Sequence, residues 1–111
     1  YVSPSVELGR GNVVMSHASL HHRVSLGNFN IVNANVVIEH ETTVEDGVFL
    51  AASACIGARA NIGTGAFVGL NATIREDVRI AGYSFIGMGS CVLDHIETPS
   101  VVFGVPAKAR Q

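Results

Sequence analysis

Aliphatic side chains recur at every sixth position of the chain from Val2 to Val92 without a break. The members of this column are Val2, Leu8, Val14, Leu20, Leu26, Val32, Ile38, Val44, Leu50, Ile56, Ile62, Val68, Ile74, Ile80, Ile86 and Val92. A six-residue period fits neither the 3.6-residue turn of an α-helix nor the 3.5-residue period of a coiled coil. Because β-branched residues are also frequent, the pattern predicts one short β-strand and one corner in each hexapeptide.

The other positions of the hexapeptide agree with this interpretation. The residue four places after each aliphatic is nearly always small or β-branched, with Asn12 and Asn30 as polar exceptions. Glycine directly follows the aliphatic residue at Gly9, Gly27, Gly57, Gly63, Gly69 and Gly87. A tight corner favours a residue without a Cβ atom. Three such hexapeptides are therefore expected to complete one triangular coil.

Residues eighteen positions apart should then stack on neighbouring coils. Phe49, Phe67 and Phe85 follow each other at this interval, and so do His22 and His40. Such ladders are expected where parallel strands lie about 4.8 Å apart. The sequence therefore predicts an all-β, single-domain parallel β-helix of about five triangular coils over residues 1–97, with the aliphatic column along its axis.

The repeat breaks at Thr98–Pro99, so residues 98–111 are expected to form a C-terminal tail that covers the end of the β-helix. At the other end, Tyr1–Val2 enters the repeat at once and leaves the first coil without a cover. We expect either that an upstream domain is missing from the chain or that a naturally short protein covers this edge by association.

Composition and charge narrow the class of protein. The chain of 111 residues is 48% hydrophobic and 14% charged, with a net charge of −2, which favours a well-buried globular fold over disorder. No apolar run approaches the roughly eighteen residues of a membrane span. The seven Lys and Arg residues are scattered among nine carboxylates, which argues against a nucleic-acid partner. With no leader or lipidation signal, we expect a cytoplasmic protein without a membrane partner.

The two cysteines occupy the same column of the predicted β-helix. Thr73 lies between Cys55 and Cys91, so the two cysteines are two coils, or about 10 Å, apart. This separation is too long for a disulfide bond. Both are expected to be reduced packing residues.

The hexapeptide pattern resembles that of the hexapeptide-repeat acyltransferases, in which an aliphatic residue is followed by Gly, two variable residues, a small residue and another variable one. The resemblance implies a left-handed parallel β-helix. The handedness rests on the resemblance alone, because the usual rule for parallel crossovers gives the opposite hand.

Two segments resemble a narrower group within that family. They are Val-Ile-Glu-His-Glu at residues 37–41 and Val-Phe-Gly-Val-Pro-Ala-Lys at residues 102–108. Both are similar to segments of sialic-acid O-acetyltransferases and UDP-4-amino-sugar N-acetyltransferases. The resemblance implies transfer of an acetyl group from acetyl-CoA to an amine or hydroxyl of a nucleotide-linked sugar. Full-length members carry an additional N-terminal domain for the nucleotide sugar, and we expect this sequence to lack it.

The resemblance also assigns roles to residues. His40 corresponds to the general base, Glu41 to the acidic residue that raises its basicity, and Asn33 to a residue near the sugar acceptor. An imidazole is well suited to accept the proton of an attacking amine or hydroxyl at neutral pH. No Ser or Cys nucleophile accompanies His40, so direct attack is expected. The positions expected to contact acetyl-CoA between subunits of a homotrimer are Phe49, Ala58, Leu70 and Met88. Lys108 is expected either to contact the CoA phosphates or to belong to the cap over the end of the β-helix.

Two of these positions depart from the family pattern. Family members commonly carry His where this chain has Phe49, and Gly where it has Ala58. Alanine can still donate its backbone N–H to the thioester carbonyl if its φ need not be positive. The loss of a polar group at Phe49 is expected to shift the acyl donor or to slow the reaction.

Three alternatives stay open. A β-helix scaffold or oligomerisation module without catalysis would share the repeat, and so would a transferase that acts on another acceptor, such as a small amine or an antibiotic hydroxyl. Some left-handed β-helix proteins are zinc carbonic anhydrases with three His ligands. Here His17 and His22 have the five-residue spacing but no third His upstream, so we expect no metal. His17, His21 and His22 are expected to be surface residues.

Overall fold

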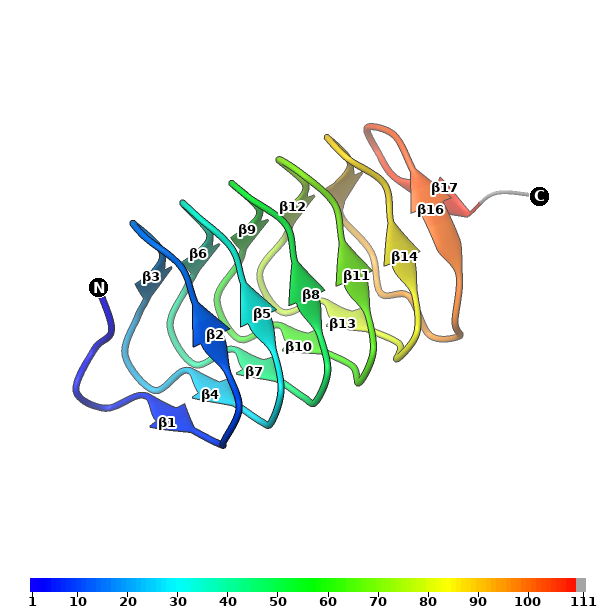
Figure 1. Cartoon of the computed structure of the whole chain (residues 1–111). Helices are drawn as coiled ribbons and strands as arrows, with labels where there is room; N and C mark the ends of the chain where they lie inside the picture. Colours follow the sequence, from blue (N-terminus) through cyan, green and yellow to red (C-terminus); the bar gives the residue numbers. More distant parts are fainter. Residues whose placement is uncertain (110–111) are drawn as a thin grey trace.

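The computed structural model describes residues 1–109, and within this range the chain is built only from short β-strands and corners. The strands form three sheets that wind around one axis (Figure 1). Arg110 and Gln111, the end of the predicted tail, lie outside the described residues. The all-β prediction is confirmed.

Each coil contributes one strand to each sheet. The first sheet contains β1 (Glu7–Leu8), β4 (Ser25–Leu26), β7 (Thr43–Val44), β10 (Asn61–Ile62) and β13 (Arg79–Ile80). The second sheet contains β2 (Val13–Val14), β5 (Ile31–Val32), β8 (Phe49–Leu50), β11 (Phe67–Val68), β14 (Phe85–Ile86), β16 (Val101–Phe103) and β17 (Lys108–Ala109). The third sheet contains β3 (Ser19–Leu20), β6 (Val37–Ile38), β9 (Cys55–Ile56), β12 (Thr73–Ile74) and β15 (Cys91–Val92).

The strand register follows the eighteen-residue interval. Ile31 pairs with Phe49, and Phe49 pairs with Phe67, in parallel strands. From the N-terminal end at the left of Figure 1, the chain rises through β2 and β5 in front and descends through β3 and β6 behind as it advances to the right, which is a left-handed coil. The predicted left-handed β-helix is confirmed.

The aliphatic column forms the core. Every member from Leu20 to Val92 is buried, whereas Val2, Leu8 and Val14 are exposed at the N-terminal end, where no coil lies beneath them. The polar exception Asn30 is fully buried, and its side chain donates to Glu45 O and accepts from Val48 N, both at 2.7 Å. Its hydrogen-bonding groups are thus satisfied inside the prism.

The corners explain the positions of some glycines. A Cβ atom on Gly63 would lie 2.8 Å from the Cα atom of Gly82 in the next coil, closer than side-chain carbons approach backbone. From Gly11 to Gly89, every sixth residue has positive φ, and ten of these corner residues are not glycine. Glu41 is one of them, with φ of 63°.

The predicted side-chain ladders are present. The rings of Phe49 and Phe67 stack with centroids 5.1 Å apart, and those of Phe67 and Phe85 with centroids 4.7 Å apart. The His22 and His40 rings stack at 5.0 Å. Cys55 and Cys91 are both free, as expected, and burial raises the pKa of the Cys55 thiol.

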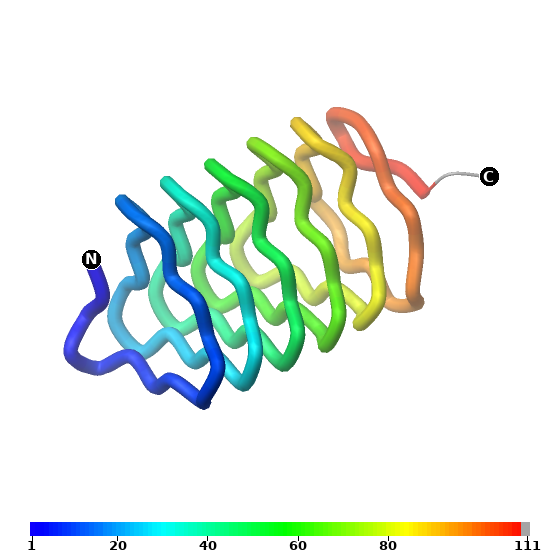
Figure 2. Tube along the Cα trace, viewed as in Figure 1, coloured from blue at the N-terminus to red at the C-terminus, as the bar shows by residue number. Residues whose placement is uncertain are grey.

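The C-terminal segment continues the second sheet before it folds back. β16 pairs in parallel with β14, and β17 then returns antiparallel to β16, so the segment extends over the end of the β-helix (Figure 2). Val102 is buried, and the Phe103 ring lies tilted at 6.4 Å from that of Phe85. The division at residue 97 stays a prediction.

Two edges of the prism carry the residues of interest. We call the corners that join the third sheet to the first, residues 21–24, 39–42, 57–60 and 75–78, the His40 edge. The corners that join the second sheet to the third, residues 15–18, 33–36, 51–54, 69–72 and 87–90, form the Asn33 edge. Across residues 1–109 there is no helix of the length and apolarity that a membrane crossing requires.

Candidate active site

His40 and Glu41 lie side by side in the corner between β6 and β7. The positive φ of Glu41 turns the chain sharply here, and its backbone N–H donates to His22 O at 3.0 Å in the coil below. His40 is half-buried, and the Glu41 side chain is more exposed. The corner therefore presents both side chains at the surface of a rigid backbone.

A direct hydrogen bond joins the two side chains. His40 Nδ1 lies 2.9 Å from Glu41 Oε1. This bond, with the added charges of His40, Arg23 and His22, lowers the pKa of the Glu41 carboxyl below its ordinary value, against the opposing effect of desolvation. A charged carboxylate only accepts, so Nδ1 donates, and the lone pair of the neutral ring is on Nε2. Among residues 1–109 no hydrogen bond to Nε2 is formed, which leaves this atom available as a base.

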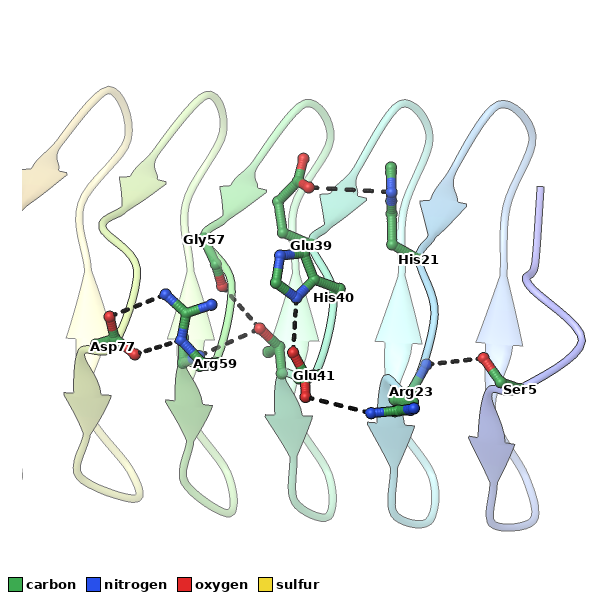
Figure 3. Close-up of polar contacts among 11 residues, drawn as sticks. Ser5, His21, Arg23, Glu39, His40, Glu41, Gly57, Arg59 and Asp77 are labelled. Carbon is green, nitrogen blue, oxygen red and sulfur yellow. Dashed lines mark hydrogen bonds and ion pairs between the residues drawn. The ribbon is translucent and has the colours of Figure 1, made fainter.

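Two residues of the preceding coil contact this dyad, and Figure 3 shows one of them, Arg23, beside Glu41. The His22 ring stacks on the His40 ring with an interplanar angle of 6°. Arg23 Nη1 lies 3.8 Å from Glu41 Oε2, the carboxylate oxygen that His40 does not use. In the next coil, Arg59 is directed instead to Asp77, with two hydrogen bonds of 2.8 and 3.1 Å. Opposite charges thus alternate along the His40 edge.

His22, His40 and Glu41 are also the residues most suited to a metal ion. One ligand atom from each lies within 4.8 Å of the others. However, the two imidazole rings are nearly parallel, and the lone pair of a ring nitrogen lies in the plane of its ring. Two parallel rings do not direct their lone pairs at one ion, so one ring must rotate before both can coordinate a metal. The arrangement is not a preformed metal site.

A separate apolar groove of about 360 Å³ runs along the Asn33 edge. Its lining residues are Asn33, Phe49, Ala51, Ala52, Phe67 and Leu70. The Asn33 amide donates to Leu50 O at 3.0 Å, so its side chain is held against the backbone. Mostly apolar walls with a single amide are typical of a site for a small organic ligand.

The remaining predicted contact residues lie at three different places. Ala58 is on the His40 edge, one coil beyond His40, and its φ is not positive. Met88 is highly exposed on the Asn33 edge, one coil beyond Leu70. Lys108 is exposed in β17, where it lines a second depression at the C-terminal end.

The structure therefore gathers the predicted residues into two groups. Asn33, Phe49 and Leu70 line one groove, whereas His40 and Glu41 occupy another edge of the prism. Sequence reasoning missed Arg23, although its opposite charge eighteen positions before Glu41 placed it in the same column. The roles assigned to all of these residues stay predictions.

Comparisons with known proteins place this geometry in context. No family model matches the chain, and no curated protein sequence matches it. Solved structures, in contrast, match closely. A variant of GDP-perosamine N-acetyltransferase from Caulobacter crescentus, in complex with CoA and GDP-perosamine, is 27% identical, with a TM-score of 0.98 over 99% of this chain.

In its fold the chain is similar to acetyltransferases that are built on a β-helix. The acetyltransferase domain of PglB from Neisseria gonorrhoeae, in complex with acetyl coenzyme A, is also 27% identical, with a TM-score of 0.96 over 98% of this chain. Serine acetyltransferase from the same organism shares the fold at 24% identity and a TM-score of 0.72, over 99% of this chain and 40% of its own. The resemblance to sugar acetyltransferases is confirmed at the level of these structures.

This chain spans about half the length of its similar structures. It covers 52% of the Caulobacter crescentus transferase and 53% of the Neisseria gonorrhoeae domain. The part of this chain that is matched is its β-helix, including the His40 edge and the Asn33 edge.

Proposed function

We propose that this chain is the catalytic β-helix of an acetyl-CoA-dependent transferase that acetylates an amine or hydroxyl of a nucleotide-linked sugar. The observation that carries the proposal is the 2.9 Å hydrogen bond between His40 Nδ1 and Glu41 Oε1, which leaves Nε2 free to accept a proton. The similar structures with CoA, acetyl-CoA and a GDP-linked sugar support the choice of donor and acceptor.

The reaction follows from these groups. His40 Nε2 accepts the proton of the acceptor amine or hydroxyl as the latter attacks the carbonyl carbon of the thioester. A new C–N or C–O bond forms, the C–S bond breaks, and the CoA sulfur leaves and takes up the proton. Glu41 stabilises the imidazolium that exists between these two proton transfers. The φ of Ala58 is not positive, and its backbone N–H would donate to the carbonyl oxygen.

The acyl donor is assigned to the groove on the Asn33 edge. Phe49 and Leu70 would pack against the pantetheine arm of acetyl-CoA, and Asn33 would lie at the acceptor end. Met88 and Lys108 lie farther toward the C-terminal end, where they would meet the nucleotide part of CoA. The base and this groove lie on different edges of one chain, so we propose that two neighbouring copies in a homotrimer complete each site.

A transfer assay tests the proposal. The protein is incubated with acetyl-CoA and either GDP-linked or UDP-linked 4-amino sugars, and release of the CoA thiol is followed together with the mass of the sugar product. We expect acetylated sugar from the wild type and a fall of about 100-fold or more in kcat for His40→Ala, with the KM for acetyl-CoA unchanged. Full activity of His40→Ala would overturn the role of the base.

The scaffold alternative makes a different prediction. Phe49 in place of a polar residue favours it, because a module without catalysis has no need to orient an acyl donor at that position. A scaffold of this kind would bind no acetyl-CoA.

The proposed reaction takes place in the cytoplasm, where acetyl-CoA and nucleotide sugars are both present.

A further inference from the structure

We propose that His22 and Arg23, in the corner beneath the dyad, are positioning residues that set the orientation of His40 and Glu41 before substrate binds. This inference rests on the proposed function of His40 as the base. It assigns a role to two residues whose side chains contact the dyad. Each residue of the lower corner contacts one residue of the upper corner.

Arg23 acts on the carboxylate. Glu41 has two oxygens: Oε1 accepts from His40, and Oε2 lies 3.8 Å from the Arg23 guanidinium. The two contacts therefore hold opposite sides of one carboxylate group and fix its rotation. At this exposure, the pair contributes little to the free energy of unfolding. The Arg23–Glu41 pair instead sets the orientation of the Glu41 carboxylate, and this orientation determines which nitrogen of His40 carries the proton.

His22 acts on the ring. The nearly parallel stack, at 5.0 Å between centroids, covers one face of the His40 imidazole and restricts its rotation about the Cβ–Cγ bond. The opposite face is directed toward the next coil, where the corresponding column position is Ala58, which has only a methyl group. The stack thus supports the ring from below and leaves room above it.

The lower corner is itself held rigidly. The Arg23 backbone N–H donates to Ser5 Oγ at 2.9 Å, and His22 O accepts from the Glu41 backbone N–H at 3.0 Å. Strands β4 and β7, which follow the two corners, pair in register. Because the backbones of both corners are fixed relative to each other, the side chains of His22 and Arg23 provide a stable support for the dyad.

The rigid support has a chemical consequence. With Nδ1 of His40 committed to Glu41, the neutral ring presents its lone pair at Nε2 only. If Glu41 turns away, the proton can move to Nε2, and the ring then lacks a lone pair at the atom that faces substrate. Loss of the support should therefore lower kcat and leave the binding of acetyl-CoA, on another edge, unaffected.

The Arg23 part is tested with Arg23→Met, which keeps an unbranched side chain but removes the charge. The matched control is Arg59→Met, which lies in the same column but donates its hydrogen bonds to Asp77. Nitrogen-15 NMR of the ring of His40, at about pH 8 where an ordinary imidazole is neutral, reports the tautomer directly. We expect Nδ1–H in the wild type and in Arg59→Met, and a mixture of tautomers in Arg23→Met, with partial recovery in Arg23→Lys.

The His22 part is tested with His22→Ala and His22→Phe. Phenylalanine keeps a ring for the stack, whereas alanine removes it. We expect a fall of about tenfold in kcat for His22→Ala, an unchanged KM for acetyl-CoA, and recovery in His22→Phe. His21→Ala is the control, because His21 pairs with Glu39 at 3.9 Å and not with the dyad.

The outcomes separate this inference from the proposed function. The tautomer measurement needs no turnover, so an inactive wild type with no acetyl-CoA binding would refute the proposed function alone. Unchanged His40 tautomers in Arg23→Met, or equal kcat values for His22→Ala and the wild type, would overturn the corresponding positioning role. Thermal melting of each variant identifies any that fail to fold, and the conservative Arg23→Lys and His22→Phe variants then serve as the test.

Discussion

Glu41 Oε1 lies 2.9 Å from Nδ1 of His40, although the two residues are adjacent in the chain and the corner between them turns through a positive φ. The left-handed backbone conformation of Glu41 is found together with this contact. A base and its orienting carboxylate are thereby supplied by two consecutive residues.

Removal of the Glu41 charge tests this contact. Glu41→Gln keeps the size of the side chain but no longer stabilises an imidazolium, so we expect kcat to fall by about 10-fold to 100-fold with acetyl-CoA affinity unchanged. Glu39→Gln is the control, since Glu39 lies in the same corner but pairs with His21. The measurement is steady-state transfer kinetics for the two variants. Equal losses in both variants would contradict the specific role of Glu41.

The Arg59–Asp77 pair predicts a pH dependence of stability. The hydrogen bond from Arg59 lowers the pKa of Asp77 below its ordinary value. A lowered pKa in the folded state gives a stabilising contribution that is present above the unfolded pKa, about 4, and is lost as the pH falls through the folded value. Asp77→Asn should therefore be less stable than the wild type at pH 7 and should approach it in acid. Denaturant unfolding at a series of pH values measures this.

The Arg59→Met variant provides the check on that result. Breaking the pair from the other side should remove the same pH-dependent contribution, and the double variant should show no further loss. If the free energies of unfolding of the wild type and Asp77→Asn differ by the same amount at every pH, this pair is excluded as a source of the pH dependence of stability.

Burial along the aliphatic column predicts a contrast between two identical substitutions. Leu50 is fully buried, whereas Leu8 is 51% exposed in the first coil. We expect Leu50→Ala to lower the free energy of unfolding by about 2–5 kcal/mol and Leu8→Ala to lower it by less than about 1 kcal/mol. Urea denaturation of the two variants gives both values. Similar losses would indicate that the N-terminal coil is covered in solution.

The aromatic ladder allows a test of the donor groove. Phe49 lines the groove on the Asn33 edge, whereas Phe85, in the same ladder, does not. Phe49→Ala should weaken acetyl-CoA binding by about tenfold through loss of apolar contact, and Phe85→Ala should leave it unchanged. Both variants remove one ring from the ladder, so thermal melting should shift similarly. Equal acetyl-CoA affinities of Phe49→Ala and the wild type would place the donor elsewhere.

Much of the fold was predictable because the repeat fixes columns. A six-residue period assigns every residue to a sheet or a corner, and the eighteen-residue interval then predicts the stack of His22 on His40 and the ladder from Phe49 to Phe85. These relationships depend only on the backbone register. The handedness, by contrast, came from the family resemblance, because both hands give the same sequence period.

Other features depend on details that the repeat does not contain. The hydrogen bond of Glu41 to His40 requires particular side-chain rotamers, which a column position does not specify. The return of Val101–Phe103 to the second sheet follows the loss of the repeat, so no period predicted it. The placement of His40 and Asn33 on different edges was implicit in their seven-residue separation, which is one hexapeptide plus one residue.

Calorimetric titration of acetyl-CoA into the purified protein tests the central claim most directly, because donor binding does not depend on which sugar is the acceptor. A light-scattering mass measured on the same sample gives the number of chains in the assembly. The account predicts saturable binding at one site per chain in a trimer. A well-folded protein that binds no acetyl-CoA would contradict the transferase assignment and favour a β-helix scaffold.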